Sequence, residues 1–503
     1  MSLAIVYSRA SSGMTAPLVT VEAHLSNGMA GLNIVGLPEA AVKESKDRVR
    51  SALMNTHFEF PIRRITINLA PADLPKEGGR FDLPIALGIL AASGQIPRDK
   101  LAEYEFTGEL ALSGELRGIR GVLPVVLGVH SSGRSLIVPQ QNASEAALVQ
   151  HAKVLSARHL LDVCSHLQGI RSLLPCVPEV LSVPEKGTSD LADVKGQPHA
   201  KRALEIAAAG RHSLLYMGPP GTGKTMLASR LPSILPPISD QEALEVAAVV
   251  SVSNSGFDPK KWKCIPFRSP HHSSSSVALV GGGRPPRPGE ISLAHHGVLF
   301  LDELPEFTRH VLECLREPLE SGQITISRAA FQTVFPAHFQ FIASMNPCPC
   351  GYAGSLTDSC HCTKEQIKRY MGKLSGPLLD RIDMHVEVAR LAPESLTNQA
   401  AEERSEIVRE RVIQAREYQY QRQGKYNTVL TVPELDHYAN IEREAQQLLN
   451  QVMKKFNLSA RVYHRIIKVA RTIADLEGSA TISEQFLGEA LNYRSLDRIK
   501  AII

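Results

Sequence analysis

A glycine-rich turn, GPPGTGKT at residues 218–225, offers the clearest chemistry in the sequence. It lies between a short apolar run and an amphipathic helical pattern. Glycines let backbone N–H groups converge on phosphate oxygens, and the start of a helix adds partial positive charge. The order of strand, turn and helix therefore predicts an ATP-binding P-loop. Its members are Gly218, Pro219, Pro220, Gly221, Thr222, Gly223, Lys224 and Thr225.

Two carboxylates, Asp302 and Glu303, follow four apolar residues in GVLFLDELPEF, as in a Walker B strand. We expect Lys224 to reach the β- and γ-phosphates, Thr225 and Asp302 to hold Mg²⁺, and Glu303 to polarise the attacking water. Asn346 ends a further apolar run, HFQFIASMNP, and its amide is expected to orient that water, although Asn is also a common turn former. Together these residues predict hydrolysis of ATP.

Four of the eight cysteines crowd into the segment CPCGYAGSLTDSCHC, whereas the others are scattered singly. Four thiolates on one short loop can close a tetrahedral zinc site without a long-range closure cost. The C-x-C spacing is less usual than C-x2-C and His361 is a spare ligand, so unliganded cysteines or a redox pair are alternatives. The predicted zinc ligands are Cys348, Cys350, Cys360 and Cys362.

The composition is that of an ordinary folded protein. The 503 residues suggest about three domains, and 43% apolar with 21% charged residues exclude a disordered chain. The formal charge is only +4, so any contact with nucleic acid must come from local basic surfaces. The sequence contains no long apolar run and no basic segment before its first apolar residues, which predicts a cytoplasmic protein without a membrane partner.

The elements divide the chain into an α/β part, a linker, a second α/β part and a helical end. Residues 1–168 alternate β-rich runs, such as 65–75 and 135–139, with a buried helical pattern at 81–94. Residues 169–189 are rich in proline and predict a linker. Residues 190–392 predict a mainly parallel sheet that is covered on both faces. Residues 393–503 show helical spacing and predict a bundle of helices.

Residues 190–503 resemble an AAA+ ATPase of the helix-2-insert and presensor-1-hairpin group, near the magnesium-chelatase motor subunit. The whole chain resembles the ComM (YifB) family through the strings IVGLPEAAVKESKDRVRSAL, NLAPADLPKEGGRFDLPIALGILAASG, PFRSPHHSSSSVALVGGG, MNPCPCGY and LSARVYHRIIKVARTIADL. The resemblance implies an AAA+ core at 190–392 with a zinc loop at 348–362, and a C-terminal helical lid at 393–503.

This resemblance also implies roles for residues outside the two nucleotide motifs. The segment 193–197 (DVKGQ) is similar to the one that covers the base, Asn346 to sensor 1 and Arg461 to sensor 2. Arg381 is similar to an arginine finger, which acts on the nucleotide of the next subunit and so requires a ring, here a homohexamer. From the residues alone, a salt bridge of Arg381 with Asp380 or Asp383 is an equal alternative.

An insert between the two nucleotide motifs and the following hairpin bear on the substrate. The insert is basic and rich in Ser and Gly, so it can follow a phosphate backbone, and solvated loops are the alternative. Its histidines, His271 and His272, are expected to be surface or hydrogen-bonding residues rather than metal ligands. In the family these elements face a central pore, where Arg328 can meet DNA. The basic residues of the insert are Lys260, Lys261, Lys263, Arg268, Arg284 and Arg287.

The first 168 residues resemble the catalytic domain of Lon protease (a ribosomal S5 domain 2-like fold), which makes an ATP-dependent protease a rival function. The alignment puts Arg80 or Phe81 at the position of the nucleophilic serine and Leu123 at that of the lysine. Because neither pair contains a nucleophile and a base, we expect a non-proteolytic domain for ring assembly or DNA contact.

The family resemblance implies an ATP- and Mg²⁺-dependent DNA motor with a structural Zn²⁺. Such a helicase drives branch migration of three- and four-stranded DNA intermediates during recombination in natural transformation. Its implied partners are single-stranded and branched DNA, a homohexamer of the chain, and recombinase-coated DNA as a further candidate. The alternative is a chelatase-like or protein-remodelling ATPase that acts on a protein partner.

Overall fold

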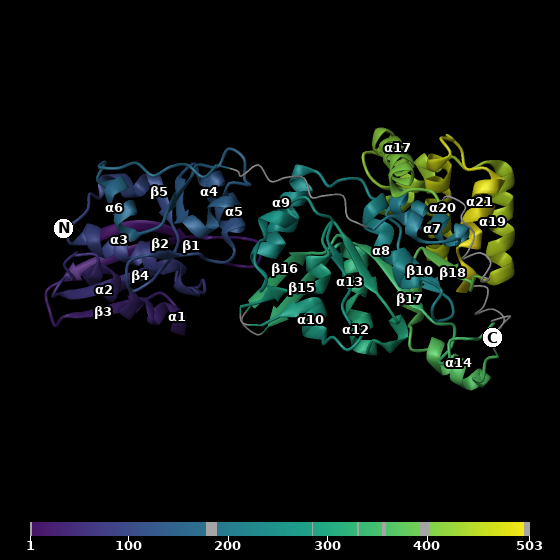
Figure 1. Ribbon diagram of the computed structural model, residues 1–503, viewed down its shortest axis with the longest axis horizontal. Coiled ribbons are helices and arrows are strands. Elements are labelled where there is room, and N and C mark those ends of the chain that lie inside the picture. Colours follow the sequence, from purple (N-terminus) through teal and green to yellow (C-terminus); the bar gives the residue numbers. More distant parts are fainter. Residues whose placement is uncertain are drawn as a thin grey trace.

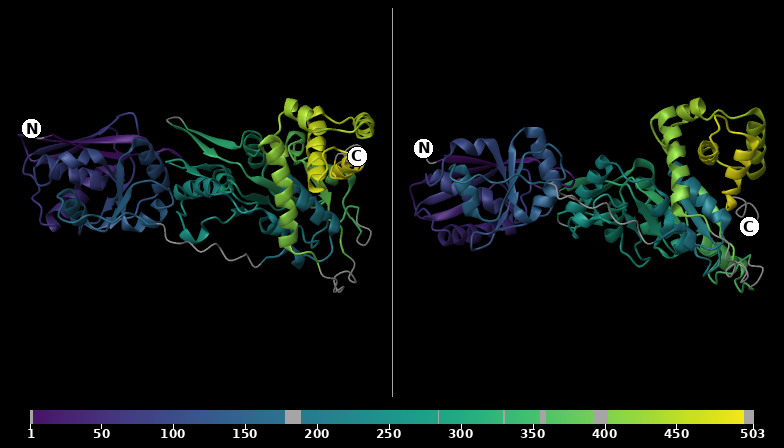
Figure 2. Two further views of the ribbon diagram at one scale, coloured as in Figure 1. Left: turned by 90° about the horizontal axis from the view of Figure 1, so that it is seen from above. Right: turned by 45° about the horizontal axis from the view of Figure 1, so that its top comes forward.

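The computed structural model describes residues 3–177, 189–283, 285–328, 331–354, 359–391 and 402–496. The molecule is elongated: an N-terminal domain lies at one end, an α/β core in the middle and a group of helices at the other end (Figure 1). The two further views in Figure 2 show the same order. None of the helices in the described part of the chain has the length and apolar character needed to cross a membrane.

The N-terminal domain is built on a mixed sheet of seven strands in the order β3-β4-β2-β1-β5-β8-β9. Alternate residues of β1, β2 and β4 are buried, which is the period of strands that pack on one face. The seven strands are β1 (Leu3–Arg9), β2 (Leu18–Ser26), β3 (Gly31–Val35), β4 (Arg64–Ala70), β5 (Tyr104–Phe106), β8 (Ser135–Pro139) and β9 (Val154–Ala157), and a small separate pair is β6 (Glu109–Leu110) with β7 (Leu116–Arg117).

The helix predicted at 81–94 is α3 (Asp82–Ala92), whose residues are all buried against this sheet. The strand expected at 65–75 ends at Ala70, because Pro71 cannot donate to the ladder. The strand expected at 135–139 is β8. The other helices of the domain are α1 (Ala40–Lys43), α2 (Ser45–Asn55), α4 (Val122–Ser132), α5 (Ala143–Ala146) and α6 (Leu160–Leu167).

The central core has five parallel strands in the order β11-β14-β17-β10-β18, which confirms the predicted parallel sheet. Alternate residues of one strand serve opposite faces: Leu214 and Tyr216 pack with α7 and α8, while Leu215 and Met217 pack with α12 and the hairpin. The strands are β11 (Phe267–Arg268), β14 (Val298–Leu301), β17 (Gln340–Met345), β10 (Leu214–Met217) and β18 (Met384–Glu387).

Helices cover both faces of this sheet, and two short additions project from it. The predicted hairpin is present as β15 (Gln323–Arg328) and β16 (Phe331–Pro336), and a second small pair is β12 (Gly281–Gly282) with β13 (Arg287–Pro288). The helices are α7 (Pro198–Gly210), α8 (Lys224–Ile234), α9 (Asp240–Ser251), α10 (Ser276–Val280), α11 (Glu290–Leu293), α12 (Arg309–Cys314), α13 (Arg316–Ser321), α14 (Lys364–Met371) and α15 (Gly376–Leu379).

The C-terminal part is helical, and its buried residues join the same hydrophobic cluster as α7 and α8. It contains α17 (Ser405–Gln423), α18 (Val432–Tyr438), α19 (Arg443–Phe456), α20 (Ala460–Leu476) and α21 (Glu484–Asn492). The predicted boundary between residues 392 and 393 lies outside the described residues, as does most of the predicted linker at 169–189.

The N-terminal domain packs directly on α9 of the core. Val125 and Val126 of α4 share a hydrophobic cluster with Ala247 and Ala248 of α9. The Gly121 N–H donates to the Ser251 carbonyl at 3.0 Å. The turn after β1 also reaches the hairpin, where a Cβ on Gly13 would collide with the side chain of Thr333. The two domains therefore meet through side chains and backbone, not only through the linker.

Candidate active site

The carboxyl ends of three neighbouring strands, β10, β14 and β17, meet at one edge of the parallel sheet. Each is followed by polar residues: the P-loop after β10, Asp302 after β14 and Asn346 after β17. Ligands of open α/β sheets bind at this edge. The cavity there measures about 420 Å³ and is lined by Pro220, Gly221, Thr222, Gly223, Lys224, Thr225, Met226, Asp302, Glu303, Ser344, Met345 and Asn346.

The P-loop folds as its glycines require. Gly221 and Gly223 have φ of 77° and 86°, in the left-handed region that glycine adopts without strain. The Lys224 ammonium donates to the carbonyls of Gly218 and Pro219 at 2.8 and 2.7 Å, and to Asn346 Oδ1 at 3.2 Å. Burial lowers the pKa of Lys224, and the nearby carboxylates oppose that shift. The lysine and the asparagine of the next strand are thus held side by side in the cavity.

Thr225 and Asp302 provide oxygen ligands of the kind that Mg²⁺ prefers. The Thr225 hydroxyl donates to Asp302 Oδ2 at 2.7 Å. The other carboxylate oxygen, Oδ1, accepts from the Ser344 hydroxyl and from the Glu303 N–H. Mg²⁺ is usually held by one or two protein oxygens together with water and phosphate oxygens, so this set fits the ion. Ser344 is a contributor that sequence reasoning missed, because it lies inside an apolar strand.

Glu303 has a partner that the motif does not reveal. Its backbone lies in the left-handed region with φ of 52°. Its carboxylate lies 3.1 Å from Nδ1 of His272, which belongs to the insert. His271 bonds instead to the Ser273 hydroxyl at 2.8 Å. The hydrogen-bonding role is confirmed for His271, whereas His272 lies close to Glu303, a neighbour that was not predicted.

The segment 193–197 contacts the P-loop from outside the cavity. The amide of the buried Gln197 donates to the Ala389 carbonyl at 2.7 Å and to the Thr222 carbonyl at 3.5 Å. This links the segment to the end of β18 as well as to the glycine-rich turn. Its role in covering the base stays a prediction.

The two predicted arginines, Arg381 and Arg461, are not among the residues that line the cavity. They lie together at another place, on either side of Glu320 of α13. A nitrogen of Arg381 is 2.5 Å from Glu320 Oε1, and one of Arg461 is 3.7 Å from the same oxygen. The Arg381 contact lowers the pKa of Glu320. Arg381 is largely buried, whereas the side chains of Arg461 and Glu320 are about half exposed.

The alternative salt bridge of Arg381 with Asp380 or Asp383 is therefore wrong. Asp383 is buried and pairs with Arg465, and it also accepts from the Ser213 N–H at 2.9 Å. Burial raises the pKa of Asp383, but the charge of Arg465 and the surrounding donors outweigh it and bring that pKa far below its usual range. The partner of Arg381 thus comes from the distant helix α13 and not from its neighbours in the sequence.

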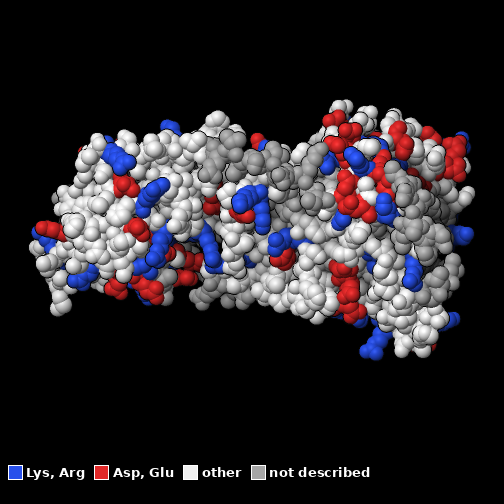
Figure 3. All heavy atoms as spheres, viewed as in Figure 1, with Lys and Arg blue, Asp and Glu red and all other residues white. Residues whose placement is uncertain are grey.

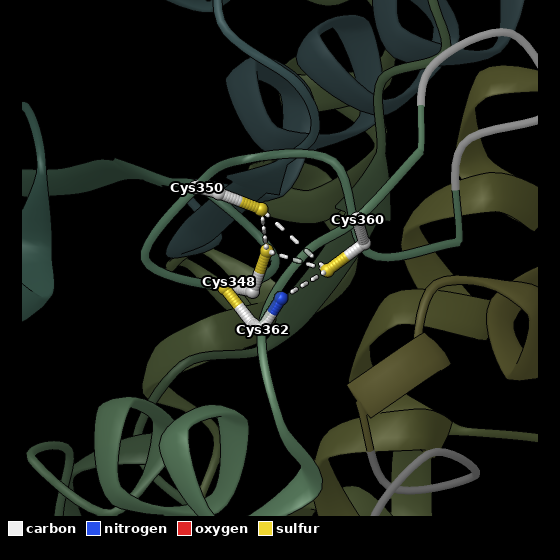
Figure 4. A group of neighbouring side chains, drawn as sticks. All are labelled: Cys348, Cys350, Cys360 and Cys362. Carbon is white, nitrogen blue, oxygen red and sulfur yellow. Dashed lines mark hydrogen bonds between the residues drawn. The ribbon is translucent and has the colours of Figure 1, made fainter.

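The four clustered cysteines converge in space (Figure 4). Their sulfur atoms all lie within 4.8 Å of one another, and three of the separations are 3.3, 3.5 and 3.7 Å. A tetrahedral Zn²⁺ with bonds of about 2.3 Å places its sulfurs about 3.8 Å apart, so the set fits zinc. A hydrogen bond from the Tyr352 N–H, the largest of several effects, lowers the pKa of Cys350 to about 6, which favours its thiolate. For Cys360 and Cys362, a backbone hydrogen bond lowers the pKa, but desolvation and the neighbouring thiols outweigh it and raise the pKa, so the support for the metal site comes from the distances between the sulfur atoms.

This cysteine loop touches the P-loop. Gly351 has φ of 89°, and a Cβ at this position would lie 2.7 Å from Cδ of Pro220 and 3.9 Å from Cγ of Asn346. Only glycine allows so close an approach without displacement. The loop that carries Cys348 and Cys350 therefore packs directly against the glycine-rich turn.

Several basic side chains of the insert are already paired within the chain, which the sequence did not suggest. Lys263 pairs with Asp240, Arg268 with Glu290 at 2.5 Å, and Arg287 bonds to Asn254. Lys260 and Lys261 are exposed, and no ion pair of theirs is found among the described residues. On the face in Figure 3, basic and acidic residues are interspersed. Arg284 and the side chain of Arg328 lie outside the described part of the chain.

A second group of metal-type side chains, Glu245, His295 and His296, lies between α9 and β14. His295 Nδ1 accepts from the His338 N–H at 3.1 Å, so its proton sits on Nε2, which lies 3.2 Å from Glu245. His296 Nε2 lies 2.7 Å from the same carboxylate oxygen. Since Nε2 of His295 is a donor, the group is a hydrogen-bonded link between α9 and the Walker B strand rather than a metal site.

The two positions that align with the Lon dyad hold no protease chemistry. Arg80 donates from Nη2 to the Arg120 carbonyl at 3.0 Å, and Leu123 is fully buried in α4. Neither side chain is a nucleophile or a base. The structure gives the protease alternative no support at this place.

Three family models match the chain in succession. They are described as subunit ChlI of Mg-chelatase over residues 21–142, magnesium chelatase subunit ChlI over 190–396, and the C-terminal part of magnesium chelatase subunit ChlI over 402–494. The breaks between the matches fall near the linker and near the start of the helical end.

Full-length relatives are more similar still. The chain is 54% identical to the competence protein ComM of Haemophilus influenzae, with 99% of both chains covered. It is 51% identical to the protein YifB of Escherichia coli, over 99% of this chain and 98% of the relative. A magnesium-chelatase subunit ChlI of Cyanophora paradoxa is 26% identical over 37% of this chain and 43% of its own length.

Proposed function

This chain belongs to the ComM (YifB) family of magnesium-chelatase-related AAA+ proteins, and we propose that it is an ATP-driven DNA motor. The observation that carries the proposal is the cavity at the sheet edge. There one chain brings together a phosphate-binding loop, an Mg²⁺ ligand pair and the candidate base Glu303. Such a set serves nucleotide hydrolysis, because hydrolysis needs a base positioned beside the phosphate and Mg²⁺ ligands, whereas binding alone does not.

The residues of the cavity have separate roles in the proposed hydrolysis. Backbone N–H groups of the P-loop and Lys224 bind the phosphates, and Thr225 with Asp302 holds Mg²⁺. An Mg²⁺ ion held by these two residues would neutralise charge on the β- and γ-phosphates. Asn346, already in contact with Lys224, orients the water that Glu303 polarises. The four cysteines would hold Zn²⁺, and the bound ion would stiffen the loop that lies against the glycine-rich turn.

Arg381 and Arg461 complete the site of a neighbouring subunit in this proposal. Both meet an exposed carboxylate, Glu320, away from the cavity of their own chain. Both arginines contact the same carboxylate oxygen of Glu320. That oxygen is anionic, as are the oxygens of the γ-phosphate that the arginines would contact in the next subunit. The arginines can exchange Glu320 for the γ-phosphate of a neighbour only if subunits form a ring. This requirement supports a homohexamer as the active form.

Branched DNA is the proposed substrate. The name of the H. influenzae relative refers to competence, and the exposed Lys260 and Lys261 together with the hairpin offer contacts for a phosphate backbone. Hydrolysis at the subunit interfaces would move the insert and the hairpin, and these would pull a strand through the ring. Three- and four-stranded intermediates of recombination, coated with recombinase or bare, are the substrates that we expect.

The test is ATP-dependent branch migration of a synthetic four-way junction and of a three-stranded intermediate, beside a linear duplex. Wild-type protein should move the branched substrates, and Glu303→Gln, which keeps the shape of the side chain but removes its charge, should not. ATPase activity that no DNA changes, with no movement of either substrate, would contradict the proposal. It would favour instead a motor that acts on a protein partner, as the paired charges of the insert would allow.

A further inference from the structure

A second cavity, with a volume of about 400 Å³, lies where the N-terminal domain meets the core. Cavities of this size hold small molecules, and they are often found between domains. This one shares no lining residue with the nucleotide cavity, so the proposed function gives it no role. Its walls include residues 77–80 and 118–121 of the N-terminal domain, residues 285–287 of the insert and Thr333 of the hairpin.

A helix begins at this cavity without a side-chain cap. The turn Gly79–Phe81 runs directly into α3, and Gly78 before it has φ of 67°. Among the described residues, no side chain caps this start and no acceptor is found for the N–H groups of Gly79 and Arg80. A Cβ placed on Gly78 would meet no atom within 4 Å, so the space beside it is open. The start of a helix carries partial positive charge, and an anion can bind there.

Arg80 brings an incompletely compensated charge to the same place. Its Nη2 donates to the Arg120 carbonyl at 3.0 Å, whereas Nη1 is buried and has no hydrogen-bond partner in the part of the chain that the structure describes. Burial lowers the pKa of Arg80 to about 10, although the charge of Glu77 opposes this shift. Buried charges and buried donors are usually paired, and a bound ion is one explanation for a donor that is not.

The remaining charges of the walls define the kind of anion. Arg120 and Arg287 bring the number of lining cations to three, and Glu39, Glu77 and Glu109 supply three carboxylates. This balance leaves no net charge to attract a long polyanion. A carboxylate accepts hydrogen bonds from hydroxyl groups, whereas it repels a phosphate. The walls therefore suit a compact molecule with one phosphate group and several hydroxyls.

We propose that this cavity binds a sugar phosphate or a similar polyol phosphate, with the phosphate group at Arg80 and the start of α3. The phosphate would compensate the charge of Arg80 and accept from the N–H groups of the helix start. The carboxylates would accept hydrogen bonds from the hydroxyls. Because the insert and the hairpin also form the walls, the bound molecule would join the N-terminal domain to the two elements that we propose to contact DNA. The inference goes beyond the proposed function and does not depend on it.

The test measures binding of ribose 5-phosphate by isothermal titration calorimetry. It uses full-length Lys224→Ala protein, in which the P-loop lacks the lysine that meets phosphates. We expect a single site per chain. Arg80→Gln should weaken binding by at least about tenfold, because a hydrogen bond to a charged group contributes that much. Arg63→Gln changes an exposed arginine of the same domain outside the cavity, so this matched control should bind as before.

Arg120→Gln is a second variant, for the case that loss of the partly buried Arg80 disturbs the packing of the two domains. Arg120 is exposed, and no ion pair of its side chain is found among the described residues. This variant should therefore melt at the wild-type temperature and still bind ribose 5-phosphate more weakly. Binding that neither variant weakens would overturn the inference.

A short single-stranded oligonucleotide distinguishes the two sources of a sugar-linked phosphate. If it leaves ribose 5-phosphate bound, the site takes a small molecule. If it displaces ribose 5-phosphate and itself binds more weakly to Arg80→Gln, the phosphate of a DNA strand occupies the same site. If neither ligand binds in a way that depends on Arg80 or Arg120, the inference fails. That failure would leave the proposed function untouched, because these measurements require no ATP hydrolysis.

Discussion

The nucleotide cavity and the Glu320 cluster use the same kinds of charged groups in opposite ways. In the cavity, Lys224 and Thr225 begin the helix that follows β10, Asp302 follows β14, and short hydrogen bonds fix each of them. At Glu320, two long arginine side chains reach one exposed carboxylate from separate elements. The first arrangement is preorganised within one chain, whereas the second is the one in which we propose an exchange of partner.

This difference indicates how a ring can control hydrolysis. A cavity whose ligands all lie within one chain is expected to bind nucleotide without a neighbour. In the proposed ring, the arginines would stabilise charge on the γ-phosphate only after leaving Glu320 for another subunit. Binding and hydrolysis should therefore separate experimentally, the first depending on the cavity and the second on the interface.

The largest effect is expected from Lys224→Ala. Removal of the ammonium takes away the side chain that meets the phosphates, so binding of a fluorescent ATP analogue should be lost in isolated subunits as well as in rings. Lys425→Ala is a matched control, since Lys425 pairs with Glu434 in the helical end at 2.6 Å. If Lys224→Ala still bound nucleotide, the cavity would not be the nucleotide site that the comparison assumes.

Arg381→Ala should leave nucleotide binding intact and lower hydrolysis about a thousandfold, the usual effect of losing such an arginine. The sharper measurement mixes Arg381→Ala with Lys224→Ala subunits. In mixed rings a Lys224→Ala subunit still presents Arg381 to an intact cavity of its neighbour, so activity should reappear. Mixtures no more active than the two variants alone would show that Arg381 does not act between subunits.

Much of the cavity could be predicted from the sequence because its parts are local. The P-loop and the Asp302–Glu303 pair are each contiguous strings, and a parallel sheet brings strand ends to one edge whatever the strand order. The buried helix at 82–92 was predictable for the same reason, since its apolar residues are consecutive.

Contacts that depend on strand order or on distant elements could not be predicted. His272 reaches Glu303 only because β11 lies next to β14, and Arg381 reaches Glu320 across an interval that includes the whole hairpin. The insert also appeared freely basic, yet Arg268 finds Glu290 on a neighbouring element. Ion pairs of this kind follow from the tertiary fold, and the local spacing of charges does not reveal them.

The smallest effect on nucleotide affinity is expected from changes in the cysteine loop, because this loop contacts the outer side of the glycine-rich turn. Cys348→Ser removes one of four ligands and should lower the zinc content from about one per chain to a trace, since structural sites need all four. The melting temperature should fall by about 2–4 °C for each kcal/mol lost. Nucleotide affinity should drop severalfold, because Gly351 no longer holds Pro220 in place.

The matched control is Cys314→Ser, whose thiol lies outside the cluster and is free. It should keep its zinc and its nucleotide affinity, and chelation of wild-type protein should reproduce the effect of Cys348→Ser. Mixed rings sharpen the comparison once more: Cys348→Ser subunits should still supply an effective Arg381 to a wild-type neighbour, because the described part of the cysteine loop contacts Pro220 and not Glu320. Failure of that supply would mean that the loop acts on the interface, and the cavity and the Glu320 cluster would then have to be treated as one site.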